Sequence, residues 1–165
     1  ADVLAERPEV DASTAVRARE GGEGTFGEAY GTFLDTNGFD PAERDPVRFV
    51  EDDDLAYVML RYRQCHDFWH VLFGLPPTVF GELVLKWFEL VHMGMPVAAL
   101  SATVGPLQLT SEERAVMRDV YIPWAVRTGK EAEFLMNVYY EREFGSDLDE
   151  LRRRLRIEPA PKSPP

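Results

Sequence analysis

The 165-residue sequence has a single cysteine, Cys65, and few basic residues for its length. One cysteine excludes an internal disulfide framework, so a reducing compartment is the simpler expectation. Eighteen lysines and arginines stand against 29 aspartates and glutamates, which gives a formal net charge of −11. This balance argues against nucleic acid as a partner, because phosphate binding requires clustered cationic side chains. It also opposes docking to an anionic membrane by charge alone.

Long apolar runs are missing as well. No stretch reaches the roughly 18 to 20 uninterrupted apolar residues that a spanning helix requires. The first residues lack the apolar core of a signal peptide, and the sequence does not begin with methionine, so it is compatible with an upstream targeting segment. What the chain does contain is 45% hydrophobic residues, of which aromatics make up a large part, and this composition is typical of a globular protein.

Helical patterns dominate the chain, and strand patterns are weak. The polar residues 1–24 are expected to form a loosely ordered arm, and the proline-rich residues 158–165 a disordered tail. Residues 25–157 are expected to form one all-α domain of about six to eight helices. The expected helices cover residues 25–36, a short segment near Val47, about 53–73 with Gly74 as its stop, 78–93, 111–129 with a kink or split at Pro123, 130–144 and 148–157.

The segment 61–89 contains two of the three histidines of the chain. An α-helix turns about 100° per residue, so His70 lies about 40° and Asp67 about 100° from His66 around the helix axis. Two imidazoles four residues apart can converge on one divalent ion. If the chain reverses near Leu75–Pro77, Glu82 on the next helix returns to the height of the histidines. Two nitrogens and two oxygens suit Zn²⁺, and also Fe²⁺ or Mn²⁺.

A non-functional interpretation stands beside the metal site, because histidine pairs at this spacing arise readily by chance and are often packed at the rim of a core. Lys86, one turn after Glu82, is expected to form a salt bridge with it. His92 is expected to be a polar residue at a helix end. Three residues before the motif are compatible with contact to the substrate carboxylate or to the metal ligands, and equally with a solvated face: Arg61, Tyr62 and Arg63. Three polar residues on a later aromatic helix are candidates for the outer shell of the metal: Asn137, Tyr140 and Glu141.

Longer blocks of sequence surround this motif, including VRFVEDDDLAYVMLRYRQCHDFWHVLFGLPPTVFGELVLKWFE at 47–89, EGTFGEAY at 23–30, GPLQL at 105–109, YIPWA at 121–125 and LMNVYYEREF at 135–144. With these blocks, the chain from about residue 23 to residue 157 resembles the Coq-four family of coenzyme Q (ubiquinone) biosynthesis proteins. The H-D-x-x-H-x(11)-E signature of that family maps without a gap onto His66, Asp67, His70 and Glu82. GLPP stands where the family commonly has GMPT, which leaves the ligands unchanged.

The resemblance implies a helical protein on the matrix side of the mitochondrial inner membrane, peripherally bound, within a complex of coenzyme Q biosynthesis proteins. In a bacterium the cytoplasmic face of the inner membrane is the equivalent place. The activity implied is a carbon–carbon lyase reaction, the C1 decarboxylation of a polyprenylated 4-hydroxybenzoate, in a simple or an oxidative form. The alternative is a non-catalytic prenyl-lipid-binding scaffold that organises the complex. A metallohydrolase is a third reading, but the chain has neither GxSxG nor HExxH.

The implied metal centre has His66, Asp67, His70 and Glu82 as ligands, with zinc expected first and iron, manganese or cobalt where the reaction is oxidative. In simple decarboxylation C1 must receive a proton, and a protonated Glu82 or Asp67 is the expected donor. The segment 80–105 is apolar on more than one face, so part of it is expected to contact the prenyl tail of the quinone lipid or the bilayer. The same surplus of apolar surface favours a homodimer.

Overall fold

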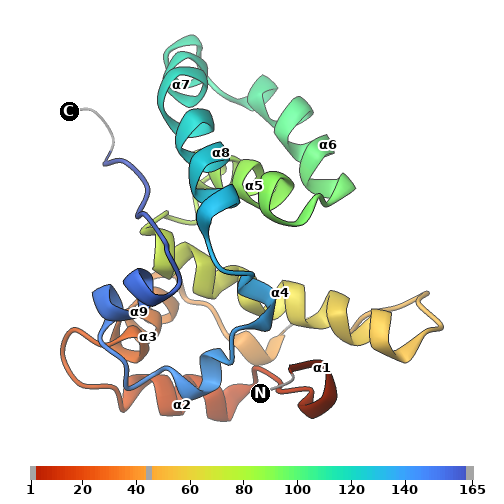
Figure 1. The fold of residues 1–165 in the computed structure, drawn as a ribbon, viewed down its shortest axis with the longest axis vertical. Helices are drawn as coiled ribbons and strands as arrows, with labels where there is room; N and C mark the ends of the chain where they lie inside the picture. Colours follow the sequence, from red (N-terminus) through yellow and green to blue (C-terminus); the bar gives the residue numbers. More distant parts are fainter. Residues whose placement is uncertain (1–2, 44–45, 163–165) are drawn as a thin grey trace. The chain divides into compact units, whose positions relative to one another are not determined.

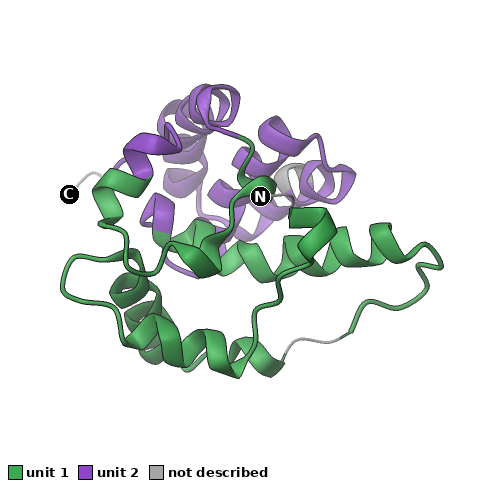
Figure 2. Ribbon diagram, turned by 60° about the horizontal axis from the view of Figure 1, so that its bottom comes forward, with its two compact units in different colours: residues 1–71, 134–151 green, residues 72–133, 152–165 purple. Residues whose placement is uncertain are grey.

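A computed structural model describes residues 3–43 and 46–162 of the chain. Among these residues there is no β-strand, only an isolated antiparallel bridge between Thr25 and Asp147. The all-α prediction is therefore confirmed. Figure 1 colours the helices along the sequence, and Figure 2 colours the two compact units into which the chain divides. Unit 1 comprises Ala1–Val71 and Phe134–Leu151, and unit 2 comprises Leu72–Glu133 and Arg152–Pro165. No helix of the described part is both long and apolar enough to cross a membrane.

Unit 1 is built from helices at the start of the chain and from short turns near its end. Its elements are α1 (Val3–Glu6), α2 (Ala12–Arg19), α3 (Phe26–Asn37), the 3₁₀ turn η1 (Pro41–Glu43), most of α4 (Asp53–Phe73), the 3₁₀ turns η4 (Leu135–Asn137) and η5 (Tyr140–Arg142), and the first half of α9 (Leu148–Arg154).

The first 24 residues, expected to be a loose arm, contain two of these helices. A capping box begins α2: the Asp11 carboxylate accepts from the Thr14 backbone N–H at 2.9 Å, and the Thr14 hydroxyl accepts from the Asp11 N–H at 3.1 Å. Buried Val10 and Ala18 then anchor the segment to the core. Reciprocal caps of this kind satisfy N–H groups that would otherwise lack partners, which stabilises even a short helix.

The core of unit 1 is aromatic. The ring of Phe68 on α4 lies 4.6 Å from that of Tyr30 and 4.8 Å from that of Tyr140 between ring centroids. Phe26 and Phe144 complete the cluster, and Phe26, Tyr30, Phe68 and Tyr140 have no exposed surface. Each such pair contributes about 0.5–1.5 kcal/mol beyond the burial of its area. The cluster therefore ties α3 and the segment 140–144 to one face of α4.

Unit 2 consists of α5 (Val79–Met93), α6 (Pro96–Val104), the 3₁₀ turn η2 (Gly105–Gln108), α7 (Ser111–Val116), the π-turn η3 (Met117–Tyr121) and α8 (Ile122–Glu131), followed by the end of the chain. Helices α5 and α8 pack against each other. The Phe73 ring lies 4.4 Å from that of Phe88 and 5.4 Å from that of Trp124, centroid to centroid. Gly129 permits the close approach of α8, because a Cβ there would lie 3.0 Å from a methyl of Val91.

The predicted helices agree with the structure best where periodicity and a stop signal coincide. α4 and α5 have nearly their expected bounds, and Pro123 lies in the first turn of α8 where the 111–129 helix is split. The prediction of a helix over 130–144 is wrong. Two 3₁₀ turns form there, with extended backbone at Val138, because the buried Tyr140 hydroxyl donates to the Leu135 carbonyl at 3.0 Å and holds the chain in a tight fold. The residues after Val47 up to 52 also form no helix.

Residues 158–162, expected to be disordered, are held along unit 2. The Ala160 N–H donates to the Phe73 carbonyl at 2.8 Å, Trp124 Nε1 donates to the Glu158 carbonyl at 3.1 Å, and the Tyr121 hydroxyl donates to the Pro161 carbonyl at 2.9 Å. Partners supplied by the packed helices thus order a sequence with little intrinsic structure. Residues 163–165 lie outside the described part.

Candidate metal centre

His66 and His70 lie one turn apart on α4, in unit 1. The helix is long and regular here, because Asp52 caps its start by accepting from the Leu55 N–H at 2.9 Å and Gly74 ends it in the left-handed conformation at φ 68°. The two Nε2 atoms lie 3.2 Å apart, and the ring planes are inclined at 81°. The structure therefore brings the two predicted imidazole ligands together at their Nε2 atoms.

The separation of the two nitrogens fits a metal ion. An ion about 2.0–2.1 Å from each nitrogen would make an N–metal–N angle of about 103°, close to the tetrahedral angle of structural and catalytic zinc sites. Without an ion, one imidazole must donate to the other, since both Nε2 atoms cannot carry a proton at 3.2 Å. The His66–His70 pair is thus suited both to hold a divalent ion and to share one proton.

The pair has an apolar setting within unit 1. The Phe33 ring on α3 stacks on the imidazole of His70, with centroids 5.7 Å apart and an interplanar angle of 19°. His70 is almost fully buried, whereas His66 is partly exposed. The contact with Phe33 orients the His70 ring. Sequence analysis did not assign Phe33 to the site, although its place on the apolar face of the 25–36 helix was the available signal.

Asp67, the third predicted ligand, is partly exposed and lines an open hollow of about 270 Å³ in unit 1. The same hollow is lined by Phe39, Asp40 and Glu43, so three carboxylates gather around it. The role of Asp67 as a ligand stays a prediction.

Glu82 lies in the first turn of α5, in unit 2, where it is partly exposed. Thr78 fixes the start of this helix by accepting from the Gly81 N–H at 3.2 Å. The approach of Glu82 to the histidines, and the antiparallel pairing of α4 with α5, stay predictions. Lys86, expected to pair with Glu82, forms an ion pair at 2.7 Å with the fully buried Glu89 on the same helix.

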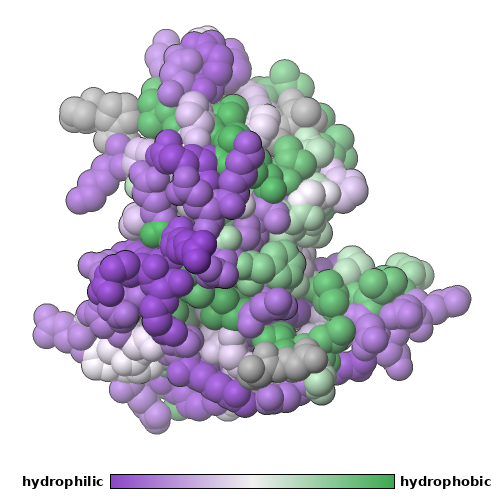
Figure 3. All heavy atoms as spheres, in the orientation of Figure 1, coloured by the Kyte–Doolittle hydropathy of each residue, from purple (hydrophilic) through white to green (hydrophobic). Residues whose placement is uncertain are grey.

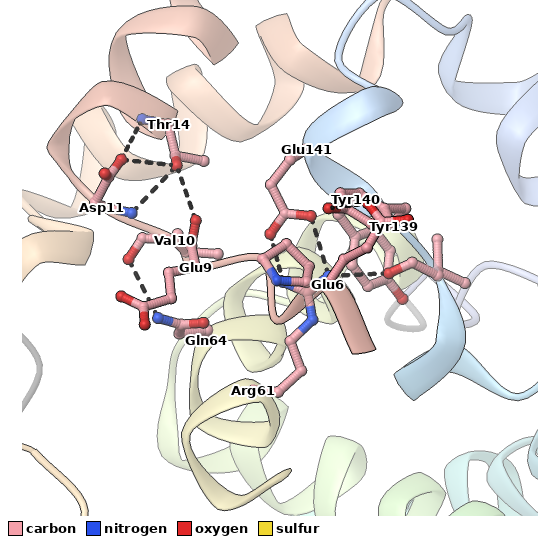
Figure 4. Close-up of polar contacts among 12 residues, drawn as sticks. Glu6, Glu9, Val10, Asp11, Thr14, Arg61, Gln64, Tyr139, Tyr140 and Glu141 are labelled. Carbon is pink, nitrogen blue, oxygen red and sulfur yellow. Dashed lines mark hydrogen bonds and ion pairs between the residues drawn. The ribbon is translucent and has the colours of Figure 1, made fainter. Parts of the chain in front are cut away.

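Arg61 forms a buried ion pair with Glu141 (Figure 4). In the sequence of α4, Arg61 precedes His66 by about a turn and a half. Its guanidinium also donates to the Val138 carbonyl at 2.9 Å. Burial opposes the charge of Arg61, but the hydrogen bonds and the charge of Glu141 outweigh it and raise the pKa of Arg61 above its ordinary value. Of the two roles left open for Arg61 and Glu141, the structure supports the structural one: they anchor α4 to the segment 138–141.

A second polar contact anchors α4 beside the histidines. Trp69 Nε1 donates to the Tyr140 hydroxyl at 3.0 Å, and burial raises the pKa of that hydroxyl well above its usual range. Tyr140 therefore stays protonated and serves as a fixed link in the chain Trp69–Tyr140–Leu135. Because Trp69 precedes His70 directly, this link holds the backbone that presents the imidazole.

His92 differs from the pair, as expected. It lies near the end of α5 in unit 2, with Nδ1 at 2.9 Å from the Gly129 carbonyl and its ring stacked on Phe88 at 4.9 Å between centroids. Burial lowers the pKa of His92, and the hydrogen bond to Gly129 opposes that shift in part. It is a neutral packing residue that joins α5 to α8.

Unit 2 also contains a hollow of about 450 Å³ beside the start of α5. Leu75, Phe80, Tyr121 and Pro161 supply its apolar walls, and Glu112 and Glu113 supply carboxylates. Sequence analysis missed it, because its walls come from the helix connection, the π-turn and the end of the chain.

Comparison with known proteins gives consistent results. A family profile described as "Coenzyme Q (ubiquinone) biosynthesis protein Coq4" matches residues 1–161. A Nematostella vectensis protein named Ubiquinone biosynthesis protein COQ4 homolog, mitochondrial, is 50% identical over 141 residues, which cover 84% of this chain and 68% of that protein. The Schizosaccharomyces pombe protein named Ubiquinone biosynthesis protein coq4, mitochondrial, is 49% identical over 137 residues, covering 83% of this chain and 50% of its own.

The human protein named Ubiquinone biosynthesis protein COQ4 homolog, mitochondrial, is 42% identical over 163 residues, 98% of this chain and 62% of that protein. This chain thus spans between 50% and 68% of the length of these relatives. A crystal structure from Nostoc punctiforme, of a protein provisionally assigned to ubiquinone biosynthesis, matches with a TM-score of 0.75 at 25% identity, covering 93% of this chain and 72% of that one.

Proposed function

The chain belongs to the Coq4 family of coenzyme Q (ubiquinone) biosynthesis proteins, and on that premise we propose that it acts in coenzyme Q biosynthesis as a metal-dependent C1 decarboxylase of a polyprenylated 4-hydroxybenzoate. The observation that carries the proposal is the convergence of the His66 and His70 Nε2 atoms, 3.2 Å apart on one helix. A divalent ion requires two such nitrogens within about 2.1 Å of one point, and the observed separation allows this.

The proposed ligands are His66, His70, Glu82 and Asp67. Each of the four offers an imidazole nitrogen or a carboxylate oxygen to a metal ion. Only five residues connect α4 and α5, from Gly74 to Thr78, and this short connection favours the return of Glu82 toward the histidines. Zinc is the first expectation for a set of imidazole and carboxylate donors, and iron, manganese or cobalt would serve an oxidative reaction.

In this proposal the residues of the chain bind and protonate the substrate head. The metal, when bound, acts as a Lewis acid toward the carboxylate or phenolate oxygens. The bond between C1 and the carboxyl carbon breaks, CO₂ leaves, and C1 takes a proton from Glu82 or Asp67. Phe33 and the Tyr140 link keep the His70 ring in place, so that the ligand geometry does not change during the reaction.

In this proposal the apolar surface of unit 2 binds the prenyl tail and contacts the membrane. Exposed apolar side chains follow one another on α6 and η2, where Leu100 is 63% and Leu107 80% exposed. Exposed apolar groups of this size usually have a partner. We assign to this surface peripheral contact with the mitochondrial inner membrane on the matrix side, or with the cytoplasmic face of the inner membrane in a bacterium.

A second candidate function is a non-catalytic prenyl-lipid-binding scaffold for other coenzyme Q biosynthesis proteins, with the ion in a structural role. The hollow of about 450 Å³ in unit 2 favours it, because its apolar walls could receive part of an isoprenoid chain. Association with those proteins and homodimerisation belong to both candidates.

A decarboxylation assay distinguishes the decarboxylase from the non-catalytic scaffold. The test uses a prenylated 4-hydroxybenzoate with a ¹³C-labelled carboxyl group and the protein loaded in turn with zinc, iron, manganese or cobalt, under air and under argon. The decarboxylase releases ¹³CO₂ with at least one metal, and His66→Ala and Glu82→Gln abolish this release. His92→Gln is the matched control, because His92 packs against Phe88 and keeps its place outside the proposed ligand set. Isoprenoid binding without ¹³CO₂ under every condition identifies the scaffold instead.

A further inference from the structure

A hollow of about 670 Å³ lies in unit 2 and is lined by the last turns of α8 and α9 and by the residues after α9. Figure 3 shows strongly hydrophilic side chains over α9. Four cations and two carboxylates line the hollow, which gives it a net charge of +2 on a chain whose net charge is −11. These charged residues are Lys130, Glu131, Arg152, Arg153, Arg156 and Glu158.

Contacts within unit 2 hold the frame of this hollow. The Glu133 N–H donates to the Leu155 carbonyl at 3.0 Å, which joins the residues after α8 to those after α9. The Nε of Arg152 donates to the Leu72 carbonyl at 2.8 Å, and this side chain is partly buried. Because the guanidinium is planar, a bond from Nε to the backbone fixes the direction of the whole group. At least one cation of the hollow is therefore held in place.

The carboxylates near the hollow do not cancel its positive charge. Arg127 on α8 binds the Glu158 carboxylate through three contacts of 2.9–3.1 Å, so a cation outside the lining already compensates Glu158. Arg156 pairs with Glu133 at 3.2 Å, and both side chains are more than half exposed. An exposed pair of this kind is weak and can exchange its carboxylate for another anion. With Arg127 and Glu133 included, five cations face three carboxylates, and the net charge is still +2.

The position of Arg156 is not explained by helix stability. Cations in the last turn of a helix complement its dipole, and this accounts for Lys130 and Arg153. Arg156 follows the end of α9 with φ 54°, in the left-handed region where glycine is favoured. The Ile157 N–H closes the helix by donating to the Arg152 carbonyl at 2.8 Å, and a glycine at 156 would allow the same bond with less strain. The arginine therefore adds a cation to the hollow at a cost in local conformation.

The charge of the rest of the chain limits the size of the anion. At physiological ionic strength charges are screened beyond about 8 Å, so a compact anion in the hollow interacts mainly with the cations around it. An extended anionic surface would also meet the acidic parts of the chain, and would be repelled there. The cations come from two helix ends and from the residues beyond α9, which suits a dianionic group with three acceptor oxygens better than a carboxylate.

We propose that this hollow binds the phosphate group of a compact soluble compound through Lys130, Arg152, Arg153 and Arg156. The proposal is independent of the proposed metal ligands and of decarboxylation. Two probes test it on the whole chain: phenyl phosphate, which carries about two negative charges near pH 7, and benzoate, which has the same ring and a single charge. The backbone N–H resonances of residues 130–133 and 152–158 report binding in ¹H–¹⁵N correlation spectra, with sodium chloride at equal ionic strength as the reference.

Phenyl phosphate is expected to shift these resonances to saturation and to bind about fivefold more tightly than benzoate, the difference that one further exposed charge pair makes. Equal affinity for the two probes would show a general attraction for anions and would overturn the assignment to phosphate. Shifts no larger than those caused by sodium chloride would show that the hollow binds no ligand, and the proposal would be abandoned.

Arg153→Glu should weaken phenyl phosphate binding by about tenfold, since it removes an attraction and adds a repulsion. Arg118→Glu is the matched control, because Arg118 is an exposed arginine of unit 2 outside the lining and should change the affinity by no more than about twofold. Circular dichroism checks the fold of both variants. If Arg153→Glu does not fold, Lys130→Glu makes the same test at an exposed residue of α8. Equal losses in the hollow variant and in the control would contradict the proposal.

Sedimentation with vesicles distinguishes a soluble phosphate compound from a lipid headgroup. The chain is mixed with phosphatidylcholine vesicles that contain or lack phosphatidic acid. Saturable binding of phenyl phosphate without sedimentation that depends on phosphatidic acid supports the soluble ligand. Sedimentation that requires phosphatidic acid, is lost in Arg153→Glu and is not reversed by phenyl phosphate would assign the hollow to a membrane surface and overturn the proposal.

Discussion

α4 in unit 1 and α5 in unit 2 both carry a polar cluster and a histidine near their C-terminal ends, but they use these groups differently. On α4, Arg61 reaches a carboxylate 80 residues away in the sequence, and the two histidines face each other. On α5, Lys86 pairs with Glu89 three residues on, and His92 donates to the Gly129 carbonyl and stacks on the Phe88 ring. The histidine pair on α4 and the packing histidine on α5 thus differ in their partners, not in their position on a helix.

The largest expected effect concerns the anchor of α4. Glu141→Gln keeps the shape of the side chain but leaves the Arg61 charge buried without compensation, and this should lower the free energy of unfolding by about 3–5 kcal/mol. The exposed pair Arg127–Glu158 in unit 2 provides the control, because Glu158→Gln should cost less than about 1 kcal/mol. Urea denaturation measures both. A similar loss of unfolding free energy in the two variants would contradict the expectation that the buried ion pair matters more for stability than the exposed one.

The second effect concerns metal affinity. Replacing an outer-shell partner typically weakens metal binding by roughly 10- to 100-fold. Because His70 is a proposed ligand, His70→Ala should weaken the affinity for Zn²⁺ by more than about 100-fold. His92→Gln should leave the affinity unchanged, since its imidazole is engaged by Gly129 and Phe88. Isothermal titration with Zn²⁺ under competition from a chelator measures the difference. Equal Zn²⁺ affinities in the two variants would contradict the prediction that His70 on α4, and not His92 on α5, binds the metal.

A smaller effect is expected from the ring that orients His70. Phe33→Leu keeps an apolar contact but removes the stacking surface, and should weaken Zn²⁺ binding by no more than about tenfold. Phe39→Leu, which changes an exposed ring next to Phe33, is the control. The same titration applies. Full affinity in Phe33→Leu would show that the helix backbone alone orients the imidazole.

The smallest effect is the pH dependence that His92 contributes. Because its folded pKa is lowered from 6.5, the unfolded chain binds a proton before the folded chain does as the pH falls. The stability contributed by neutral His92 is complete above pH about 6.5 and is lost below it, with a slope of at most about 1.4 kcal/mol per pH unit. Stability measured between pH 7 and pH 5 should fall more steeply in the unmodified chain than in His92→Gln. Parallel curves would contradict the assignment of His92 as a buried neutral residue.

Much of the fold could be predicted where the signals are local. α4 and α5 were expected with nearly their observed ends, because apolar periodicity is bounded by a cap at Asp52 or Thr78 and by a glycine at Gly74 or Gly94. The segment 130–144 has the same aromatic periodicity but forms 3₁₀ turns. There the buried hydroxyl of Tyr140, with partners on either side, outweighs helix propensity.

The end of the chain, residues 158–162, shows what composition leaves out. Its prolines correctly predict that no helix forms, but the hydrogen bonds that order Glu158, Ala160 and Pro161 come from Trp124, Phe73 and Tyr121. None of these partners is close in sequence, so composition could not reveal them. The same reason applies to the stack of Phe33 on His70.

The sequence by itself determined that His66 and His70 share one face of a helix, because the spacing of four residues and the geometry of the α-helix suffice for that. The four-residue signature, together with the flanking blocks of sequence from about residue 23 to residue 157, likewise indicated the family. Only the tertiary structure decided that Arg61 is a buried anchor with one unpaired donor and not a surface charge, and that Phe33 orients His70. The physical reason is that local spacing follows from backbone geometry, whereas burial and long-range partners depend on how side chains from distant segments pack together.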